Sequence, residues 1–202
     1  LTLSGDLRDG LFGGGISNFS LGYVNGTLEN PTAETTTPVG HFQKINPFFS
    51  RLQALGDSKF LFFFRYAGQF THDRLDSYQK FSIGGPFGVR AYPVGEAPGD
   101  EAQLLTAELR YPLPNWDGKI PGSLIGALFY DWGWSKLDFD PPTRIEVPPN
   151  RRTLSGYGIA LNWATAKEWS AQGSVAWRQQ GALVNDEQDR RPRVYLQLSR
   201  YF

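Results

Sequence analysis

Arg90 is the most strongly marked charge in a glycine-rich stretch, residues 81–102, that reads FSIGGPFGVRAYPVGEAPGDEA. Gly84 and Gly85 allow the backbone there to turn tightly or to approach a second segment closely. A cation buried by such a stretch needs an anionic partner, because an unpaired buried charge is costly. Asp131, the single acid of the downstream segment FYDWG, is the candidate partner. Paired arginine and aspartate side chains make charge-assisted hydrogen bonds, which fix one segment against another.

The segments around this stretch alternate apolar and polar side chains with the period of a β-strand. In residues 59–72, a row of aromatic side chains faces one way, while Arg65, Gln69 and Thr71 face the other. A lipid face and a polar lumen face are typical of strands in a transmembrane β-barrel. We expect about nine such strands, long enough to cross a bilayer, at residues 1–8, 12–28, 42–55, 59–72, 104–113, 123–137, 153–164, 168–180 and 194–202. Pro47 and Arg51 leave the facing of the third strand unassigned.

The connections between these strands alternate in length. Short turns are expected near Asp9, Gly56, Pro114 and Thr165, and long loops at residues 29–40, 73–103, 138–152 and 182–192. Outer-membrane barrels have short periplasmic turns and long external loops. The fold class predicted is therefore all-β, a transmembrane antiparallel β-barrel, with the long loop at 73–103 starting from the cell-surface side and folding inward.

The composition of the chain excludes several function classes. Its 202 residues include 20 basic and 20 acidic side chains, so the formal net charge is zero, which argues against a nucleic-acid partner. Cysteine is absent, which removes disulfides, zinc–thiolate sites and thiol nucleophiles. A mean hydropathy of −0.38 is compatible with a barrel, because polar lumen residues alternate with lipid-facing ones.

Candidate enzyme and cofactor motifs are weak. No helix pattern follows Gly13-Gly14-Gly15, so a phosphate-binding loop is not predicted, and no nucleophile motif indicates a lipase. His41 and His72 lie in different segments and do not form a metal site by themselves. We expect no enzyme activity, no metal and no cofactor. A secretion pore and a passive diffusion porin both remain open at this point.

Several motifs, in their order and spacing, resemble the outer-membrane transporters of two-partner secretion. This family includes the haemolysin activators and the filamentous-haemagglutinin transporter, and it belongs to the barrel-assembly-protein superfamily. The resemblance covers nearly the whole chain and depends on Phe81-Ser82-Ile83-Gly84-Gly85, Val89-Arg90-Ala91-Tyr92, Gly99-Asp100-Glu101, Glu108-Leu109-Arg110-Tyr111, Phe129-x-Asp131-x-Gly133, Arg151-Arg152-Thr153-Leu154-Ser155-Gly156 and the terminal Phe202.

The resemblance implies that residues 1–202 are the C-terminal part of a single barrel domain of about 16 strands. N-terminal periplasmic domains would precede it in a longer protein. The loop at 73–103 would insert into the barrel, with Arg90 and Asp131 as its latch.

Further site residues follow from the same resemblance. The loop motif comprises Gly84, Gly85, Val89, Ala91 and Tyr92. Ala91 stands where the family usually has glycine, and a positive φ there would strain an alanine. Glu108 and Arg110 either join the latch network or are unrelated lumen charges. Phe202 would be a C-terminal assembly signal.

The function implied is export of an extended exoprotein through an outer-membrane pore of a Gram-negative cell, without nucleotide. Expected partners are the secreted exoprotein, outer-membrane lipid and, through the C-terminal strand, the barrel-assembly machinery. No nucleic-acid partner is expected. The alternatives are an assembly factor of the same superfamily and a passive diffusion porin.

Overall fold

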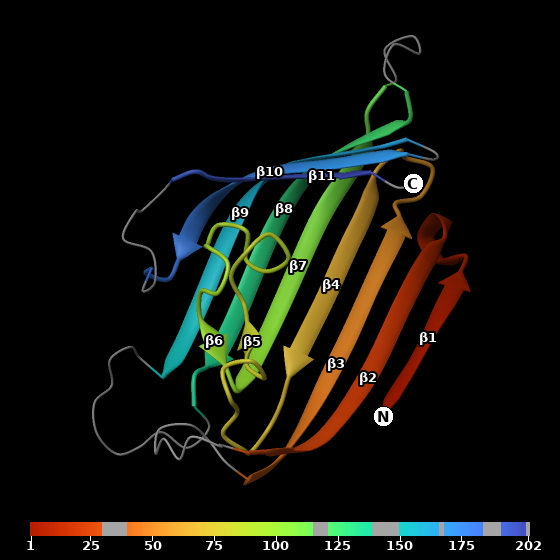
Figure 1. The fold of residues 1–202 in the computed structure, drawn as a ribbon. Helices are drawn as coiled ribbons and strands as arrows, with labels where there is room; N and C mark the ends of the chain where they lie inside the picture. The colour runs from red at the N-terminus through yellow and green to blue at the C-terminus, as the bar shows by residue number, and fades with distance from the viewer. Residues whose placement is uncertain (30–39, 115–120, 139–149, 166–167, 184–190, 201–202) are drawn as a thin grey trace.

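The computed structural model describes residues 1–29, 40–114, 121–138, 150–165, 168–183 and 191–200. Within these ranges, nine strands form one sheet in which every neighbouring pair is antiparallel (Figure 1), as the alternating pattern predicted. The order is β1 (Thr2–Asp9), β2 (Gly15–Leu28), β3 (Gly40–Ala54), β4 (Leu61–Gln69), β7 (Glu101–Pro112), β8 (Ser123–Lys136), β9 (Arg151–Ala164), β10 (Trp169–Gln180) and β11 (Arg193–Arg200).

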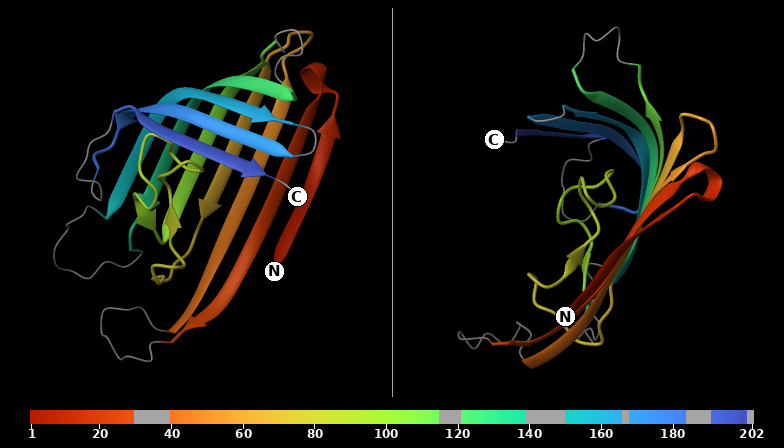
Figure 2. Two further views of the ribbon diagram at one scale, coloured as in Figure 1. Left: turned by 45° about the horizontal axis from the view of Figure 1, so that its top comes forward. Right: turned by 90° about the vertical axis from the view of Figure 1, so that its right-hand side faces the viewer.

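The sheet is strongly curved and has a convex and a concave face, as the right-hand view of Figure 2 shows. Large apolar side chains on the convex face are exposed, among them Leu21, Phe62, Leu128, Tyr157, Ile159, Leu161 and Leu196. Along each strand, exposed apolar side chains on the convex face alternate with side chains on the concave face. A barrel wall that faces lipid requires this pattern. No helix of the described residues is long and apolar enough to cross a membrane.

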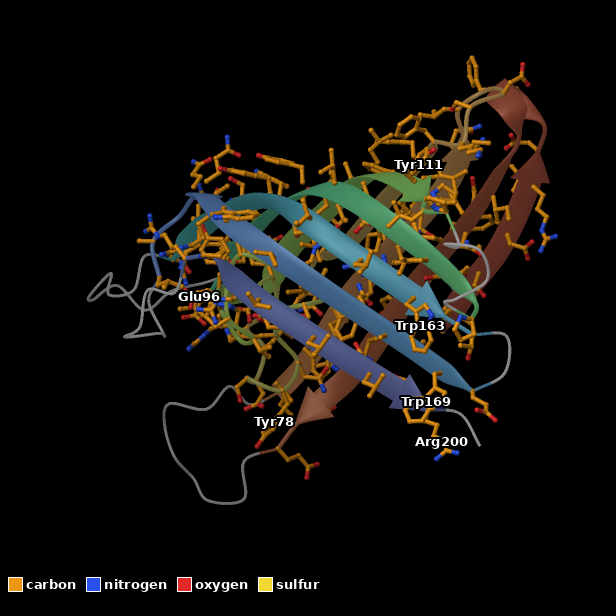
Figure 3. All side chains as sticks on the ribbon, turned by 90° about the horizontal axis from the view of Figure 1, so that it is seen from above. Tyr78, Glu96, Tyr111, Trp163, Trp169 and Arg200 are labelled. Carbon is orange, nitrogen blue, oxygen red and sulfur yellow. The ribbon has the colours of Figure 1, made fainter. Side chains whose placement is uncertain are left out.

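Trp163 and Trp169 lie at the end of the sheet that carries the short connections. In Figure 3, Trp163, Trp169 and Arg200 lie at one side of the view, and Glu96 and Tyr78 at the other. The Arg200 guanidinium lies 5.1 Å from the centroid of the Trp169 ring, and Trp163 Nε1 donates to the Pro121 carbonyl at 2.8 Å. Tryptophans with one polar partner suit a membrane–water interface.

The long loop occupies residues 70–100 and lies on the concave side of β7, β8 and β9 (Figures 1 and 2). Near the base of the loop its two arms are joined by a small antiparallel pair of strands, β5 (Phe81–Ser82) and β6 (Pro98–Gly99). β7 begins at Glu101, earlier than the predicted residue 104, since Ala102 already pairs with Gln69 and Ser135. In the sequence, the polar side chains of Glu101 and Gln103 suggested a loop rather than the start of a strand.

Other boundaries and conformations also differ from expectation. The second strand starts at Gly15, because Leu11–Gly13 forms a short 3-10 turn with Phe12 at φ 50°. Among the described non-glycine residues, positive φ occurs at Phe12 and Ala97, so the expected strain at Ala91 does not arise. Phe202 lies outside the described residues.

The core lies between the loop and the concave face of the sheet. Ile83, Val89, Ala91, Tyr92 and Ala97 of the loop pack with strand residues Ala102, Leu104, Ala127, Phe129, Leu154, Ala160 and Ala176. Small strand residues allow this approach. A Cβ added at Gly133 would lie 3.1 Å from Ile83, and one added at Gly156 would lie 2.5 Å from the Cβ of Ala91.

Candidate functional site, the loop latch

The loop latch consists of Arg90, on the loop, and Asp131, on β8. Arg90 Nε donates to Asp131 Oδ2 at 2.8 Å, and Arg90 Nη2 donates to Asp131 Oδ1 at 2.9 Å. The backbone N–H of Arg90 also donates to Asp131 Oδ2, at 3.1 Å. Both side chains are buried, with relative exposures of 5% and 1%. The bidentate geometry fixes both the position and the orientation of the loop tip.

Glu108 and Arg110, both on β7, extend the latch into a row of alternating charges. Arg90 Nη1 lies 2.8 Å from Glu108 Oε1, and Arg110 Nη2 lies 2.7 Å from Glu108 Oε2. Aromatic rings support both cations, since the Arg90 guanidinium lies 3.4 Å from the ring centroid of Phe129 and that of Arg110 lies 4.0 Å from that of Phe63. The structure therefore brings Glu108 and Arg110 into contact with the latch.

The electrostatics of Arg90 explain why it needs two carboxylates. Burial by itself would lower the pKa of Arg90, but hydrogen bonds and charge from Asp131 and Glu108 outweigh burial and raise the pKa above its ordinary value. Desolvation of a buried ion pair largely offsets its attraction, whereas removal of one partner leaves an uncompensated charge. The latch therefore contributes specificity of loop position more than net stability.

The glycines of the loop motif shape the tip. Gly85 has φ 115°, a left-handed conformation that favours glycine. A Cβ at Gly84 would lie 2.5 Å from the Pro93 carbonyl oxygen, so a side chain does not fit there. Gly84 forms a parallel bridge with Val89, whose side chain is fully buried. These contacts fold the tip back on itself and place Arg90 towards β8.

Ala91 and Tyr92 fix the loop to β9, β10 and β11. Ala91 packs against Gly156, so the requirement at this position is a small side chain. The Tyr92 hydroxyl donates to the carbonyl oxygens of Gly181, at 2.9 Å, and Gln180. Burial raises the pKa of the Tyr92 phenol, which therefore stays protonated as a donor. In turn, Tyr195 donates to the Tyr92 carbonyl at 2.6 Å.

A second ion pair, between Glu96 and Arg152, was not predicted from the sequence. Glu96 Oε1 lies 2.5 Å from Arg152 Nη1, and the Glu96 side chain is 0% exposed. Two features of the sequence could have indicated this pair. Glu96 is the single acid between residues 81 and 99, and Arg152 belongs to one of the motifs quoted above. This pair ties the returning arm of the loop to β9.

A third group of charges closes the base of the loop. Lys80 Nζ lies 2.8 Å from Asp100 Oδ1 and 2.8 Å from Asp138 Oδ1. Asp100 Oδ1 also accepts from the backbone N–H of Leu75 at 3.1 Å, and Gln69 donates to the Asp100 carbonyl at 3.0 Å. The motif containing Asp100 was recognised in the sequence, but its partner Lys80 was not.

The site can hold and position a segment. In the part of the chain that the structure describes, no group of three or more His, Asp or Glu side chains could hold a metal ion. The carboxylates of Asp131 and Glu108 are occupied by arginines. These ion pairs fix the loop across the concave face of the sheet.

Comparison with known proteins places these residues in a family. Residues 7–163 match the family model described as haemolysin secretion/activation protein ShlB/FhaC/HecB. The heme/hemopexin transporter protein HuxB of Haemophilus influenzae strain 86-028NP is 32% identical over 183 residues, which cover 87% of this chain and 32% of the relative. HuxB of a second H. influenzae isolate is 32% identical over 169 residues, 80% of this chain and 29% of the relative. The chain thus spans about a third of the length of these curated relatives. No solved structure matches.

Proposed function

The chain belongs to the haemolysin secretion/activation protein family ShlB/FhaC/HecB, outer-membrane transporters of two-partner secretion, and we propose that it forms part of a pore exporting a partner exoprotein. The exoprotein passes in an extended form and without nucleotide hydrolysis. The loop of residues 70–100 acts as a movable plug on the lumen face of the sheet.

The buried contact of Arg90 with Asp131 and Glu108 is the observation that carries this proposal. A loop held by a bidentate ion pair has one defined closed position, and breaking a few localised contacts releases it. Elements of this kind have two discrete arrangements rather than a continuous range. A passive porin does not need such a latch, because its selectivity can come from charges on a fixed constriction.

The open edges of the sheet support completion of the barrel by further strands. In the described residues, β1 pairs with β2 alone and β11 with β10 alone. Unpaired strand edges are not tolerated in lipid. We therefore expect further strands in the complete barrel. From the family membership we propose about 16 strands in total, periplasmic domains that receive the exoprotein, and insertion by the barrel-assembly machinery through the C-terminal strand with Phe202.

The names of the relatives suggest a first substrate to test. HuxB is called a heme/hemopexin transporter protein. An exoprotein that binds haem or hemopexin is accordingly the first candidate for export by the full-length protein that contains this chain.

The test is a charge swap in that full-length protein. Arg90→Asp and Asp131→Arg each place like charges in the latch, and the double variant restores opposite charges. We expect both single variants to lose export of the exoprotein and the double variant to recover part of it. Heat-modifiable gel mobility identifies variants whose barrel has not folded.

One control and two contrary outcomes make the result decisive. Glu168→Gln removes an exposed charge from the β9–β10 connection and is expected to leave export unchanged. Normal export by both folded single variants would contradict the role of the latch. If the unaltered protein passes small sugars but exports no exoprotein, the porin alternative is correct.

A further inference from the structure

β2 and β3 continue past the end of β4, at the end of the sheet that carries the long connections (Figure 1). In an outer-membrane barrel this end faces the cell surface. The outermost bridge between β3 and the chain after β4 joins Ile45 to Phe70. Beyond that bridge, residues 24–28 of β2 pair with residues 40–44 of β3. We call these two paired segments the outer hairpin.

A row of three exposed side chains marks the end of the apolar band on the convex face. Tyr23 pairs with Ile45, which pairs with Phe70, and directly paired residues share a face. Away from the cell surface, the next convex residues of β2 are Leu21 and Phe19, both exposed and apolar. A tyrosine whose ring is apolar and whose tip is polar suits the level at which hydrocarbon ends. This boundary row therefore lies at the outer limit of the hydrocarbon region.

Beyond the boundary row, the convex side of the outer hairpin is polar. Its exposed convex residues are Asn25, Thr27, His41 and Gln43. Residues 24–28 span about 16 Å along the strand, or roughly 12 Å along the membrane normal at a tilt of about 40°. The headgroup layer of a phospholipid bilayer is only roughly 5–8 Å thick on each side. The outer hairpin therefore reaches past phospholipid headgroups, to the height of a larger headgroup.

A groove of about 340 Å³ lies between the outer hairpin and the first residues of the long loop. Its apolar part is the boundary row, and its polar part comprises Gln43, Lys44, Thr71, His72 and Asp73. The Tyr23 hydroxyl donates to Gln43 Oε1 at 2.8 Å and accepts from Asn25 Nδ2 at 3.4 Å. These bonds hold the Gln43 amide in place, with its NH₂ group as a donor for a bound molecule. The groove thus combines aromatic rings with a few fixed polar groups, as ligand sites do.

The two fully charged residues that line the groove are engaged within the protein. Lys44 Nζ donates to Gln69 Oε1 at 3.0 Å and to the Gln79 carbonyl at 2.8 Å. Asp73 Oδ2 accepts from the backbone N–H of Gln43 at 2.8 Å. Phosphate groups are bound best by arginine and lysine side chains that point at them. The groove therefore suits uncharged hydroxyl groups better than phosphate.

We propose that the groove and the outer hairpin bind the saccharide headgroup of a glycolipid in the outer leaflet of the outer membrane. The acyl chains of the glycolipid lie along the apolar band below the boundary row. The rings of Tyr23 and Phe70 pack against the apolar faces of the sugar, and the amides of Gln43 and Asn25 bind its hydroxyl groups. This site depends on the outer-membrane location of the chain and not on export of an exoprotein.

The test measures how much glycolipid the purified full-length protein retains. The protein is reconstituted in nanodiscs of phosphatidylethanolamine and phosphatidylglycerol that contain rough lipopolysaccharide. Native mass spectrometry then counts the lipopolysaccharide that stays bound after transfer to mild detergent. Tyr23→Ala removes the ring and the hydroxyl, and Gln43→Ala removes the amide. The matched control, Tyr130→Ala, removes an exposed tyrosine from the convex face of β8. Heat-modifiable gel mobility identifies folded variants, and Gln43→Ala alone decides the test if Tyr23→Ala does not fold.

We expect each groove variant to retain about tenfold less lipopolysaccharide than the unaltered protein, since one or two lost contacts of ordinary strength suffice for that factor. Tyr130→Ala should retain the normal amount. Millimolar core oligosaccharide, freed from its lipid, should displace bound lipopolysaccharide, whereas added phosphatidylglycerol should not.

Three results would overturn the proposal. The first is equal retention by the folded groove variants and Tyr130→Ala, and the second is no retention by the unaltered protein. The third is displacement by phosphatidylglycerol but not by the oligosaccharide, which would mean that the groove binds acyl chains or phosphate. Export of the exoprotein is measured separately, so failure of this proposal leaves the proposed function standing.

Discussion

The concave faces of β7–β9 and of β1–β3 belong to one sheet but differ in how far their residues are buried. On β7–β9 the loop-facing positions are buried and combine small, apolar and charged residues, as Gly133, Phe129 and Asp131 show. On β1–β3 the positions on the same face are mixed in kind and more exposed, as Ser4, Asp6 and Phe48 show. The first pattern fixes the loop in one position, and the second leaves most side chains of β1 and β2 exposed or half-buried.

This difference shows that close docking constrains only the part of the face that the loop contacts. Fixed docking requires shape and charge complementarity, so each substitution should be costly on β7–β9. Most positions on β1 and β2 are exposed or half-buried, so single substitutions there should change stability little. Each prediction below therefore pairs a change at the loop with a matched change on β1 or β2 or at another exposed position.

The largest expected effect comes from removing the latch arginine. Arg90→Met leaves Asp131 and Glu108 buried without their shared cation, a loss that typically costs about 3–5 kcal/mol. Arg8→Met removes an exposed concave-facing arginine of β1 and should leave stability unchanged. The midpoint of heat-modifiable gel mobility for the purified full-length protein measures both. Equal midpoints for the two variants would contradict the comparison.

The second effect concerns the ion pair that holds the returning arm. Glu96→Gln removes the charge opposite Arg152 at a fully buried position and should cost roughly 1.5–3 kcal/mol. Protease cleavage near Val94, an exposed loop residue, should become faster because the arm is released more often. Asp6→Asn, an exposed change on β1, is the control. A double variant with Arg152→Gln should lose less than the sum of the single losses, since the two residues act as a pair.

The third prediction compares two glycines. In Gly156→Ala, the new Cβ would lie 2.5 Å from Ala91 and 2.9 Å from the Trp177 carbonyl, so overpacking of about 1–3 kcal/mol is expected. In Gly22→Ala, the nearest atoms lie 3.7 Å away, an ordinary contact, and stability should hold.

The same comparison can be sharpened with a second change at the loop. Ala91→Gly should rescue part of the loss in Gly156→Ala, since it removes one of the two close contacts. The measurement is the thermal midpoint of Gly156→Ala, Ala91→Gly, the double variant and Gly22→Ala. If Gly22→Ala is as harmful as Gly156→Ala, small size on β9 is not a docking requirement.

The sequence predicted the sheet better than the contacts of the loop. Period-two alternation and the short and long connections gave the nine strands, because lipid on one face and a polar interior on the other impose a pattern that each strand shows by itself. Boundaries were less accurate where polarity is ambiguous. Glu101 and Gln103 look like loop residues but already pair in β7.

Contacts of the site could be predicted where a sequence motif marked the residues. Contacts that depend on how the loop packs on the sheet could not be predicted. Arg90 and Asp131 were paired in advance because each is the marked charge of its segment, and the structure places them in contact. Glu96 with Arg152, and Lys80 with Asp100, could not be paired, since one sequence gives no distances between loop and sheet. At Ala91 the φ angle is not positive, and the limit on side-chain size comes from Gly156, far along the chain.

The smallest expected effect tests a hydrogen bond that carries no charge. Tyr92→Phe keeps the buried ring but removes the hydroxyl that donates to the carbonyls of Gln180 and Gly181. The loss should be about 1 kcal/mol, because two partly buried acceptors lose a donor. Tyr78→Phe, at a loop position that is 94% exposed, should have no measurable effect. Chemical unfolding in detergent micelles, followed by tryptophan fluorescence, can resolve the difference. A larger loss for Tyr92→Phe than for Glu96→Gln would mean that hydroxyl–carbonyl bonds, rather than ion pairs, hold the arm of the loop to the sheet.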